Sequence, residues 1–390
     1  MNGVHEFLRS LPAAQQPDWA GHAELGRVRE ELASLPPLVD ADDVDGLRAL
    51  LAEAAEGRVQ IIQSGDCAED WADSSADSVA RKAGLLEVLA GTMKMISHKP
   101  VIRVGRIAGQ YGKPRSKATE TVGGVELPVY RGHMVNAPEP DPELRKPDPT
   151  RMLTGYEAAR GVIEGLGWHR DERSPRPDTT VWTSHEALLL DYELPMMRTQ
   201  ADGRVLLASA HWPWIGERTR QAEGAHVALL ASVSNPVACK VGPGMTTDDL
   251  LALCLKLDPD KTPGRLTLIA RMGADTVGEK LPPLVAAVRE AGHPVIWLTD
   301  PMHGNTVSGP EGLKTRLVKT VVREVREFHR AVTEAGGVAG GIHLETTPEA
   351  VTECVADQDR LHEVGNKYTS FCDPRLNPRQ AVAVAAAWLG

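Results

Sequence analysis

Apolar residues follow two different rhythms along the 390-residue chain. Near the start, apolar side chains recur at helical spacing over residues 23–35 and 44–55, and Gly57 is well suited to end a helix. Further along, short apolar runs that are typical of buried strands alternate with amphipathic stretches. The pattern therefore predicts a helical extension over residues 1–57, followed by one α/β domain over residues 58–390.

Eight of the apolar runs are predicted to be strands, at residues 59–64, 100–104, 180–184, 208–216, 237–241, 266–270, 294–299 and 341–345. The helices predicted among them are residues 152–166, 247–257, 279–290, 313–334, 348–355 and 378–389. Alternating strands and helices indicate a parallel sheet, because a parallel connection needs a crossover of helical length. Eight such strands favour a closed (β/α)8 barrel, the TIM barrel, over an open doubly wound sheet.

A stretch rich in Pro, Asp, Glu and Arg, residues 134–178, is predicted to be a loop insertion around the helix at residues 152–166. Inserts of this kind on a barrel often cover an active site, and plain surface decoration is the alternative. The glycine-rich residues 334–341 precede a strand, which is the wrong order for a phosphate-binding loop. They are interpreted as a helix end and a turn.

Composition narrows the class of protein. The formal net charge of −10 argues against non-specific binding to nucleic acid, although a site can still be locally basic. The longest apolar runs fall far short of the about 20 residues that a membrane helix needs, and the first residues lack the pattern of a secretion signal. Five cysteines form no CxxC pair and their number is odd, so we expect reduced thiols and a cytoplasmic location.

Reactive side chains stand at or after the ends of the predicted strands, where the active sites of barrels lie. Four of them are metal-ligand types: Cys67, His303, Glu345 and Asp373. Each alone has an ordinary explanation, such as core packing for the cysteine or a turn for the aspartate. Together, one thiolate, one imidazole and two carboxylates suit a divalent ion such as Mn, Co, Fe or Zn.

Cations occupy the same ends. The polar and basic candidates are Arg106, Lys113, Arg115, Ser116, Arg218, Lys240 and Arg271. A lysine inside a buried strand needs an anionic partner, and arginine binds carboxylate or phosphate through two parallel hydrogen bonds. Several cations around one cavity therefore predict a ligand with several negative charges. Salt bridges to Glu186, Glu193 and Glu217 are the ordinary alternative.

Nine segments resemble, in order, the sequence blocks of class II 3-deoxy-D-arabino-heptulosonate 7-phosphate (DAHP) synthases over about residues 60–380: GDCAED, RVGRIAGQYGKPRS, TSHEALLLDYE, WIGERTR, KVGPGM, ARMGAD, DPMHGNT, GGIHLETT and CDPRLNPRQ. The resemblance implies a (β/α)8 catalytic barrel with N-terminal helices. It implies that the metal ligands are Cys67, His303, Glu345 and Asp373. It further implies that phosphoenolpyruvate is surrounded by Arg106, Glu217, Arg218, Lys240 and Arg271.

In this resemblance Lys113 lies between two substrates, and Arg115 and Ser116 hold the phosphate of erythrose 4-phosphate. The implied reaction joins phosphoenolpyruvate, erythrose 4-phosphate and water into DAHP and phosphate, the first step of the shikimate pathway. The implied ion is Mn²⁺ or Co²⁺, with Zn²⁺ or Fe²⁺ also compatible. The residues that move protons stay open among Lys113, Glu217 and His303. A homo-oligomer, dimer or larger, is expected.

Three departures carry further expectations. His133 replaces the acidic residue that the family usually has in this segment. We expect it near the rim of the site and a neutral effect, and a change in pH dependence or substrate choice is the alternative. The chain is shorter than feedback-inhibited members, so we expect the short form found in secondary metabolism, with weak or absent inhibition by Phe, Tyr and Trp. Cys372 adjoins Asp373, so oxidation could join it to Cys67 and eject the metal; an inert thiol is the alternative.

Three rival functions remain at this stage. The same blocks could serve an imino or amino sugar phosphate in antibiotic biosynthesis, as in aminoDAHP synthases. A non-catalytic barrel could act as a partner of a chorismate-pathway enzyme, but the complete metal and cation sets argue against it. An unrelated metal-dependent aldolase would need fewer phosphate-binding cations.

Overall fold

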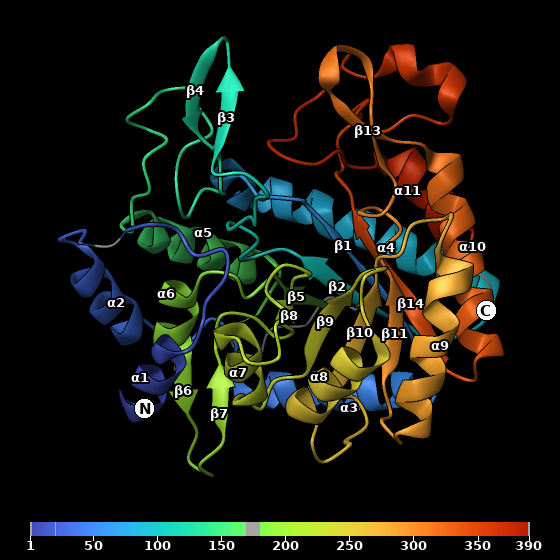
Figure 1. The fold of residues 1–390 in the computed structure, drawn as a ribbon, viewed down its shortest axis with the longest axis horizontal. Coiled ribbons are helices and arrows are strands. Elements are labelled where there is room, and N and C mark those ends of the chain that lie inside the picture. Colours follow the sequence, from blue (N-terminus) through green and yellow to red (C-terminus); the bar gives the residue numbers. More distant parts are fainter. Residues whose placement is uncertain (1, 20, 169–179, 389–390) are drawn as a thin grey trace.

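Eight parallel strands form the centre of the molecule, as the computed structural model shows for residues 2–19, 21–168 and 180–388 (Figure 1). Around the sheet their order is β5, β2, β1, β14, β11, β10, β9 and β8. Their bounds are β1 Gln60–Gly65, β2 Val101–Arg106, β5 Val181–Ser184, β8 Trp214–Ile215, β9 Val237–Val241, β10 Leu266–Ala270, β11 Ile296–Thr299 and β14 Val338–Glu345. Every strand therefore lies beside its neighbours in the sequence of eight, as in a (β/α)8 barrel.

The two edge strands meet just beyond their ends. A parallel bridge joins Glu186, after β5, to Trp214 of β8, and Trp214 N–H donates to His185 O at 3.0 Å. The barrel is thus nearly closed. Runs such as VACKV in β9 and LTLIA in β10 are buried along their whole length, which explains why they show no alternation of apolar and polar residues.

Helices surround this barrel. Those on its outside are α4 Ala76–Ser97, α5 Arg151–Gly165, α7 Ala225–Ala231, α8 Thr247–Leu257, α9 Val277–Glu290, α10 Val318–Glu334 and α11 Pro378–Ala385. Caps fix several starts: the Thr246 side chain accepts from Asp249 N at the start of α8, and Asn377 and Gln380 form a capping box on α11. In α10, Val321, Val325 and other apolar residues form one buried stripe against the sheet.

Three helices precede the barrel: α1 Asn2–Ser10, α2 Leu25–Ser34 and α3 Ala41–Ala55. Helix α3 crosses the end of the barrel where the strands begin (Figure 1). Gly264, with φ of +79°, permits this approach, since a Cβ there would lie 2.6 Å from Ala52 N. Buried residues from both sides of residue 57 pack into one cluster, and the division of the chain at that residue stays a prediction.

Short elements decorate both ends of the barrel (Figure 1). They are the hairpins β3 Thr119–Val122 with β4 Val125–Pro128, β6 Met197–Thr199 with β7 Val205–Leu207, and β12 Thr306–Ser308 with β13 Lys314–Arg316, the one-turn α6 Leu190–Glu193, and the 3₁₀ turns η1 Trp71–Ser74, η2 Leu194–Met196, η3 Pro310–Gly312 and η4 Gln358–Glu363. None of the helices in the described residues is long and apolar enough to cross a bilayer.

The barrel prediction is confirmed, three local predictions need correction, and one long helix was missed. The expected helix at residues 348–355 is wrong: this stretch is irregular, and its Glu353 side chain binds loop amides instead. The expected helix at residues 313–334 begins only at Val318, because residues 314–316 pair as β13. The strand predicted at residues 208–216 contracts to Trp214–Ile215. Helix Ala76–Ser97 was not predicted, and two glycines lower its helical propensity.

Within the predicted insertion, residues 169–179 lie outside the described residues.

Candidate active site

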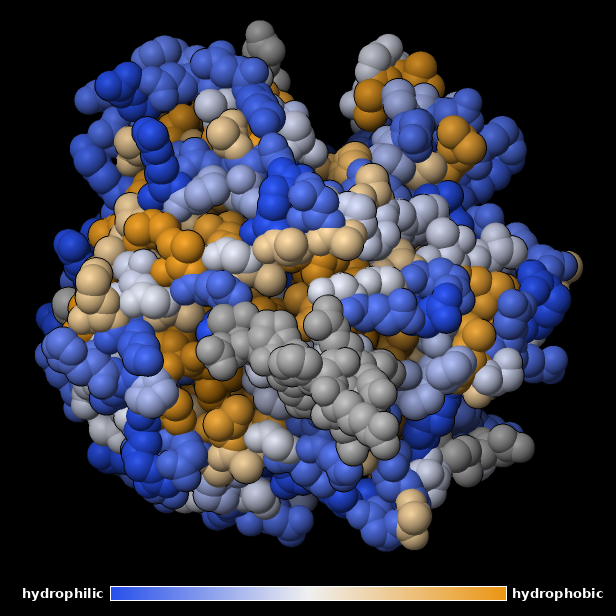
Figure 2. Space-filling view, turned by 180° about the vertical axis from the view of Figure 1, so that it is seen from behind, coloured by the Kyte–Doolittle hydropathy of each residue, from blue (hydrophilic) through white to orange (hydrophobic). Residues whose placement is uncertain are grey.

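A cleft of about 810 Å³ opens at the C-terminal ends of the strands. The hairpins β3–β4 and β12–β13 stand on either side of it, and the space-filling view shows two lobes with a notch between them at the top (Figure 2). All the site residues predicted from the sequence line this cleft except Cys67 and Glu345, which are fully buried. Strand ends from around the whole barrel therefore supply one cavity.

The thiol and the two carboxylates meet at one point. β1 and β14 are neighbours, with Gly65 opposite Glu345, so Cys67 after β1 comes beside Glu345. The ligand atoms of Cys67, Glu345 and Asp373 all lie within 4.8 Å of one another. His303, after β11, touches this group through Nε2, which lies 3.2 Å from Glu345 Oε1. Its Nδ1 lies 2.7 Å from Asp300 Oδ2, which fixes the orientation of the ring.

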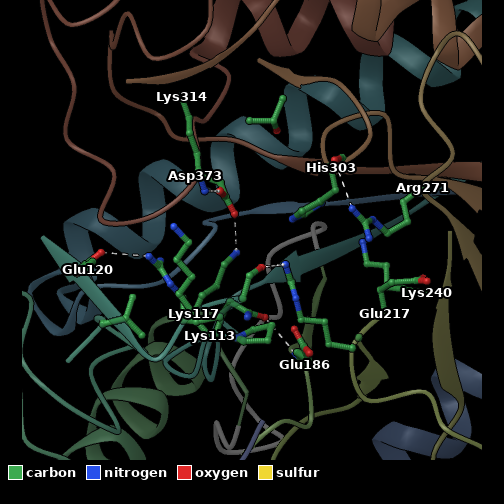
Figure 3. Close-up of a pocket in the computed structure, with 18 of the residues that line it drawn as sticks. Lys113, Lys117, Glu120, Glu186, Glu217, Lys240, Arg271, His303, Lys314 and Asp373 are labelled. Carbon is green, nitrogen blue, oxygen red and sulfur yellow. Dashed lines mark hydrogen bonds and ion pairs between the residues drawn. The ribbon is translucent and has the colours of Figure 1, made fainter. Parts of the chain in front are cut away.

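An ammonium group stands among these donors. Lys113 Nζ lies 3.3 Å from Asp373 Oδ2 (Figure 3). The same atom lies 2.7 Å from Cys67 Sγ and 3.6 Å from Glu345 Oε1. Burial disfavours the charged forms, but Lys113 and Arg316 outweigh it and hold the pKa of Asp373 well below its usual range. These S, N and O donors attract positive charge, as the ammonium group of Lys113 among them shows. Such a mixed donor set fits a divalent cation.

Glu345 is held by two guanidinium groups. Arg106 Nη2 lies 3.1 Å from Glu345 Oε1, and Arg316 Nη1 lies 2.8 Å from Oε2. Arg316 and Lys314 alternate along β13, so both face the site, and Lys314 Nζ reaches Asp373 Oδ1 at 2.8 Å. Sequence reasoning missed both residues because it assigned residues 313–334 to a helix; the alternating cations of KTR were the available signal.

Three of the four cations expected around phosphoenolpyruvate, Arg106, Lys240 and Arg271, line the inner part of the cleft. Lys240, in β9, forms an ion pair with Asp300. Burial lowers the pKa of Lys240 to about 8, although Asp300 opposes this. Arg271 Nη2 donates to His303 O at 3.3 Å. Among the described residues, Glu217 Oε1 pairs with a neighbouring arginine, whereas its Oε2 is buried without a hydrogen-bond partner.

Glu186 is a site residue that the sequence reasoning treated only as a salt-bridge partner. It lines the cleft, and in the described part of the chain its buried Oε1 has no hydrogen-bond partner. Burial raises the pKa of Glu186, and the attraction of Lys113 and Lys240 offsets part of this effect. Glu193 likewise does not neutralise the site cations, because it bonds His185 Nε2 at 2.8 Å. A glutamate two residues after the end of strand β5 was the available signal.

The outer part of the cleft carries a second set of cations. Arg115 Nη2 lies 3.3 Å from Glu120, and Arg218 Nη2 donates to Ser116 Oγ at 2.8 Å. Lys117 also lines this part, although sequence reasoning did not select it (Figure 3). Basic and hydroxyl groups thus continue from the buried centre toward the opening.

His133, which departs from the family pattern, is buried, and Cys372, which adjoins a predicted ligand, is half-buried. His133 is not near the rim: it is 6% exposed, does not line the cleft, and packs edge-on against Trp71 at 5.1 Å between ring centroids. It also bonds the Tyr130 hydroxyl. Cys372 shares a hydrogen bond with Cys67, and burial together with this bond raises the pKa of Cys67 well above its ordinary range.

Comparisons with known proteins show the family to which the chain belongs. The model of the "Class-II DAHP synthetase family" matches residues 4–167 and 161–388. The "Probable phospho-2-dehydro-3-deoxyheptonate aldolase" of Pseudomonas fluorescens is 55% identical over 389 residues, covering 100% of this chain and 97% of that protein. The "Phospho-2-dehydro-3-deoxyheptonate aldolase" of Streptomyces coelicolor is 39% identical over 425 residues, covering 97% and 94%. The solved phospho-2-dehydro-3-deoxyheptonate aldolase of Francisella tularensis is similar in fold, with a TM-score of 0.53 at 13% identity over 94% of this chain and 97% of that one.

Proposed function

The chain belongs to the class II DAHP synthase family and is a DAHP synthase, and from this premise we propose which residues carry its reaction. The family's substrates are phosphoenolpyruvate and erythrose 4-phosphate, which are condensed with water to DAHP and phosphate. One observation carries the assignment. A thiol, an imidazole and two carboxylates lie at the same barrel mouth as two successive groups of cations.

We propose that Cys67, His303, Glu345 and Asp373 hold a divalent cation, with Mn²⁺ or Co²⁺ the first choice and Zn²⁺ or Fe²⁺ compatible. The close approach of the three anionic donors and the ammonium of Lys113 among them support this set. Such an ion supplies Lewis-acid polarisation of an aldehyde oxygen. The donors would be held in place by charged neighbours before any ion arrives, which reduces the cost of binding it.

Phosphoenolpyruvate would occupy the inner cleft, where Arg106, Lys240 and Arg271 would face its carboxylate and phosphate, and Arg218 would reach it from the outer part of the cleft. Arg offers paired hydrogen bonds to both kinds of group, whereas Lys240 acts as a compact charge. Glu217 lies among these cations, and its unpartnered Oε2 gives it a polar atom to direct at the substrate or at a proton.

Erythrose 4-phosphate would enter from the outer cleft. Arg115 and Ser116 would hold its phosphate, and Lys113 would stand between the two substrates, next to the aldehyde. Cations on both sides of the reacting carbons offset the repulsion between two phosphorylated molecules. Lys314 and Lys117 at the opening add to the attraction of the second substrate.

In the proposed reaction, C3 of phosphoenolpyruvate attacks the aldehyde carbon, and water then captures the positive character at C2. Glu186 lines the cleft and its buried Oε1 has no partner among the described residues, so we assign this carboxyl the task of holding that water. Collapse of the adduct releases phosphate. Lys113, Glu217 and His303 are the groups proposed to move protons.

The regulatory and cellular setting is proposed on narrower grounds. The alignment to the Streptomyces coelicolor relative extends over 425 positions, so that relative contains stretches that this 390-residue chain lacks. This supports a short form suited to secondary metabolism, with weak or absent inhibition by Phe, Tyr or Trp. Five free cysteines support a reducing cytoplasm. A homo-oligomer, and a chorismate-pathway enzyme as its partner, are proposed from the family.

Phosphate release from phosphoenolpyruvate tests the proposal. It should require both erythrose 4-phosphate and a divalent ion, and it should vanish with a chelator or in the Cys67→Ser variant. Cys254→Ser is the matched control, because this buried cysteine lies on α8 and does not line the cleft. Release that persists without the sugar phosphate, or that is unchanged by Cys67→Ser, contradicts the assignment. Parallel turnover of an imino sugar phosphate identifies the aminoDAHP alternative.

A further inference from the structure

The chain segment between α1 and α2 lies along the side of the barrel and is held by hydrogen bonds at several points. Pro12 O accepts the backbone N–H of Ala225 at 2.9 Å, at the start of α7. Trp19 is buried, and its Nε1 donates to Asp191 Oδ2 at 2.9 Å. The N-terminal residues, dark blue in Figure 1, accordingly lie beside α6 and α7. We call residues 11–19 the N-terminal strap.

The strap is bonded to the loop that carries Glu186. Gln16 Nε2 donates to Leu188 O at 2.8 Å, and Gln16 Oε1 accepts from Leu190 N at 3.0 Å. Both partners follow β5, close to the cleft. This side of the strap therefore has a fixed position relative to the barrel mouth.

Gln15, the preceding residue, reaches a different loop. Its Oε1 accepts the backbone N–H of Arg115 at 2.8 Å and lies 3.5 Å from Arg131 Nη2. Its backbone has φ of +63°, the left-handed region that residues other than glycine seldom adopt. Strained backbone of this kind persists where the surrounding contacts require it, often at functional sites.

The loop that Gln15 holds has no regular structure of its own. Residues 112–118 are irregular, although Lys113, Arg115 and Ser116 all lie on this loop. Lys113 N–H donates to Arg131 O at 2.8 Å, so Arg131 is bonded both to the loop and to Gln15. Hydrogen bonds from outside the loop thus set its conformation, and the contact with Gln15 spans 100 positions of the sequence.

We propose that Gln15 is a positioning residue for the second substrate: it fixes the loop of residues 113–117 so that Arg115 and Ser116 meet the sugar phosphate. The inference rests on the proposed function for the role of those two residues. Gln15 does not line the cleft, so it acts through the loop rather than on the ligand. Three of the four cations proposed for phosphoenolpyruvate, Arg106, Lys240 and Arg271, lie outside this loop, and only Arg218 touches it, through Ser116, so phosphoenolpyruvate depends much less on Gln15.

Steady-state kinetics of three variants test this role. Gln15→Leu, which keeps the size but removes the acceptor, should raise KM for erythrose 4-phosphate about tenfold, equivalent to about 1.4 kcal/mol. KM for phosphoenolpyruvate and kcat should stay within about twofold. Gln15→Glu keeps an acceptor at the same reach and should stay within about threefold of the parent. Gln15→Gly removes the side chain and also the energetic cost of the positive φ. KM for erythrose 4-phosphate should therefore rise as in Gln15→Leu, without a lower melting temperature.

Amide hydrogen exchange gives a readout that does not depend on catalysis. Exchange of the Arg115 amide should accelerate in Gln15→Leu and remain slow in Gln15→Glu. The proposal is overturned if Gln15→Leu leaves this exchange and KM for the sugar phosphate unchanged, or if Gln15→Glu loses as much as Gln15→Leu. An unmodified enzyme that releases no phosphate refutes the proposed function instead, and the exchange data still decide whether Gln15 holds the loop.

Discussion

The pH dependence of phosphoenolpyruvate binding should report the buried ammonium of Lys240. This side chain is only 5% exposed, and burial lowers its pKa from the ordinary 10.5 to about 8 despite the ion pair with Asp300. The difference corresponds to roughly 3 kcal/mol of lost preference for the charged form. Arg106 acts in the same direction because it is a nearby like charge, whereas Glu345 favours the charged form.

Only the protonated lysine attracts an anionic substrate, so binding weakens as pH rises through about 8. We expect kcat/KM for phosphoenolpyruvate to fall about tenfold per pH unit above this value, because kcat/KM reports the free enzyme. The kcat should fall less, since the bound anion raises the pKa of the ammonium. In Lys240→Arg the guanidinium stays charged. The kcat/KM of this variant should be lower than that of the parent, but it should not change between pH 7 and about 9.5.

The assay is initial-rate disappearance of phosphoenolpyruvate at saturating erythrose 4-phosphate and metal. Stability provides the control: the unfolded state binds the extra proton between pH 8 and 10.5, so the contribution of Lys240 to the free energy of unfolding rises over that window. The difference between the parent and Lys240→Met should show this rise while activity falls. A flat parent profile, or the same fall in Lys240→Arg, would refute the reasoning.

Replacing Cys67 with Ser should weaken Co²⁺ binding roughly hundredfold in a titration of the chelator-treated protein, whereas Cys372→Ser should change the affinity only a few-fold. Equal affinities of the parent and Cys67→Ser would show that this thiol is not a metal ligand. Arg316→Met removes the cation that pairs with Glu345 Oε2 and leaves this oxygen buried. It should lower the free energy of unfolding by about 3–5 kcal/mol in a denaturant titration. Arg323→Met, at an exposed ion pair, should lower it by about 0.5 kcal/mol or less. Diamide treatment of metal-free protein should join Cys67 to Cys372, seen as loss of two titratable thiols, and bound metal should prevent this; an unchanged thiol count contradicts the pairing.

The sequence was sufficient to predict the barrel and the convergence of most candidate site residues on one cleft, because both depend on local patterns. Continuous apolar runs identify strands that are buried on both faces, and parallel strands place their C-terminal ends together. Arg106, Lys240 and Arg271 stand at or near such ends, so their convergence followed from topology alone. The resemblance of nine segments then assigned the individual roles.

The missed residues lie where tertiary contacts override local preference. β13 follows a turn and pairs with β12, so Lys314 and Arg316 reach the site from a stretch that continues into an amphipathic helix. Glu353 lies in the stretch expected to be a helix, where its carboxylate binds a loop instead. Gln15 contacts a loop 100 positions away, and no periodic pattern marks such a contact.

Loops that carry like charges into one cavity need anchors, because mutual repulsion would otherwise spread them apart. Buried carboxylates that do not line the cleft supply these anchors. Glu69 accepts three backbone N–H groups of residues 108–110 at 2.7–3.1 Å, just before the loop of Lys113. Glu353 accepts Thr369, Ser370 and Arg375 N–H at 2.7–3.0 Å, on both sides of Asp373. Charge-assisted hydrogen bonds to backbone are strong in a low dielectric. They therefore hold the loops in place against the repulsion among the cations before any substrate binds. A doubly anionic substrate then relieves that repulsion on binding and requires little rearrangement of the loops.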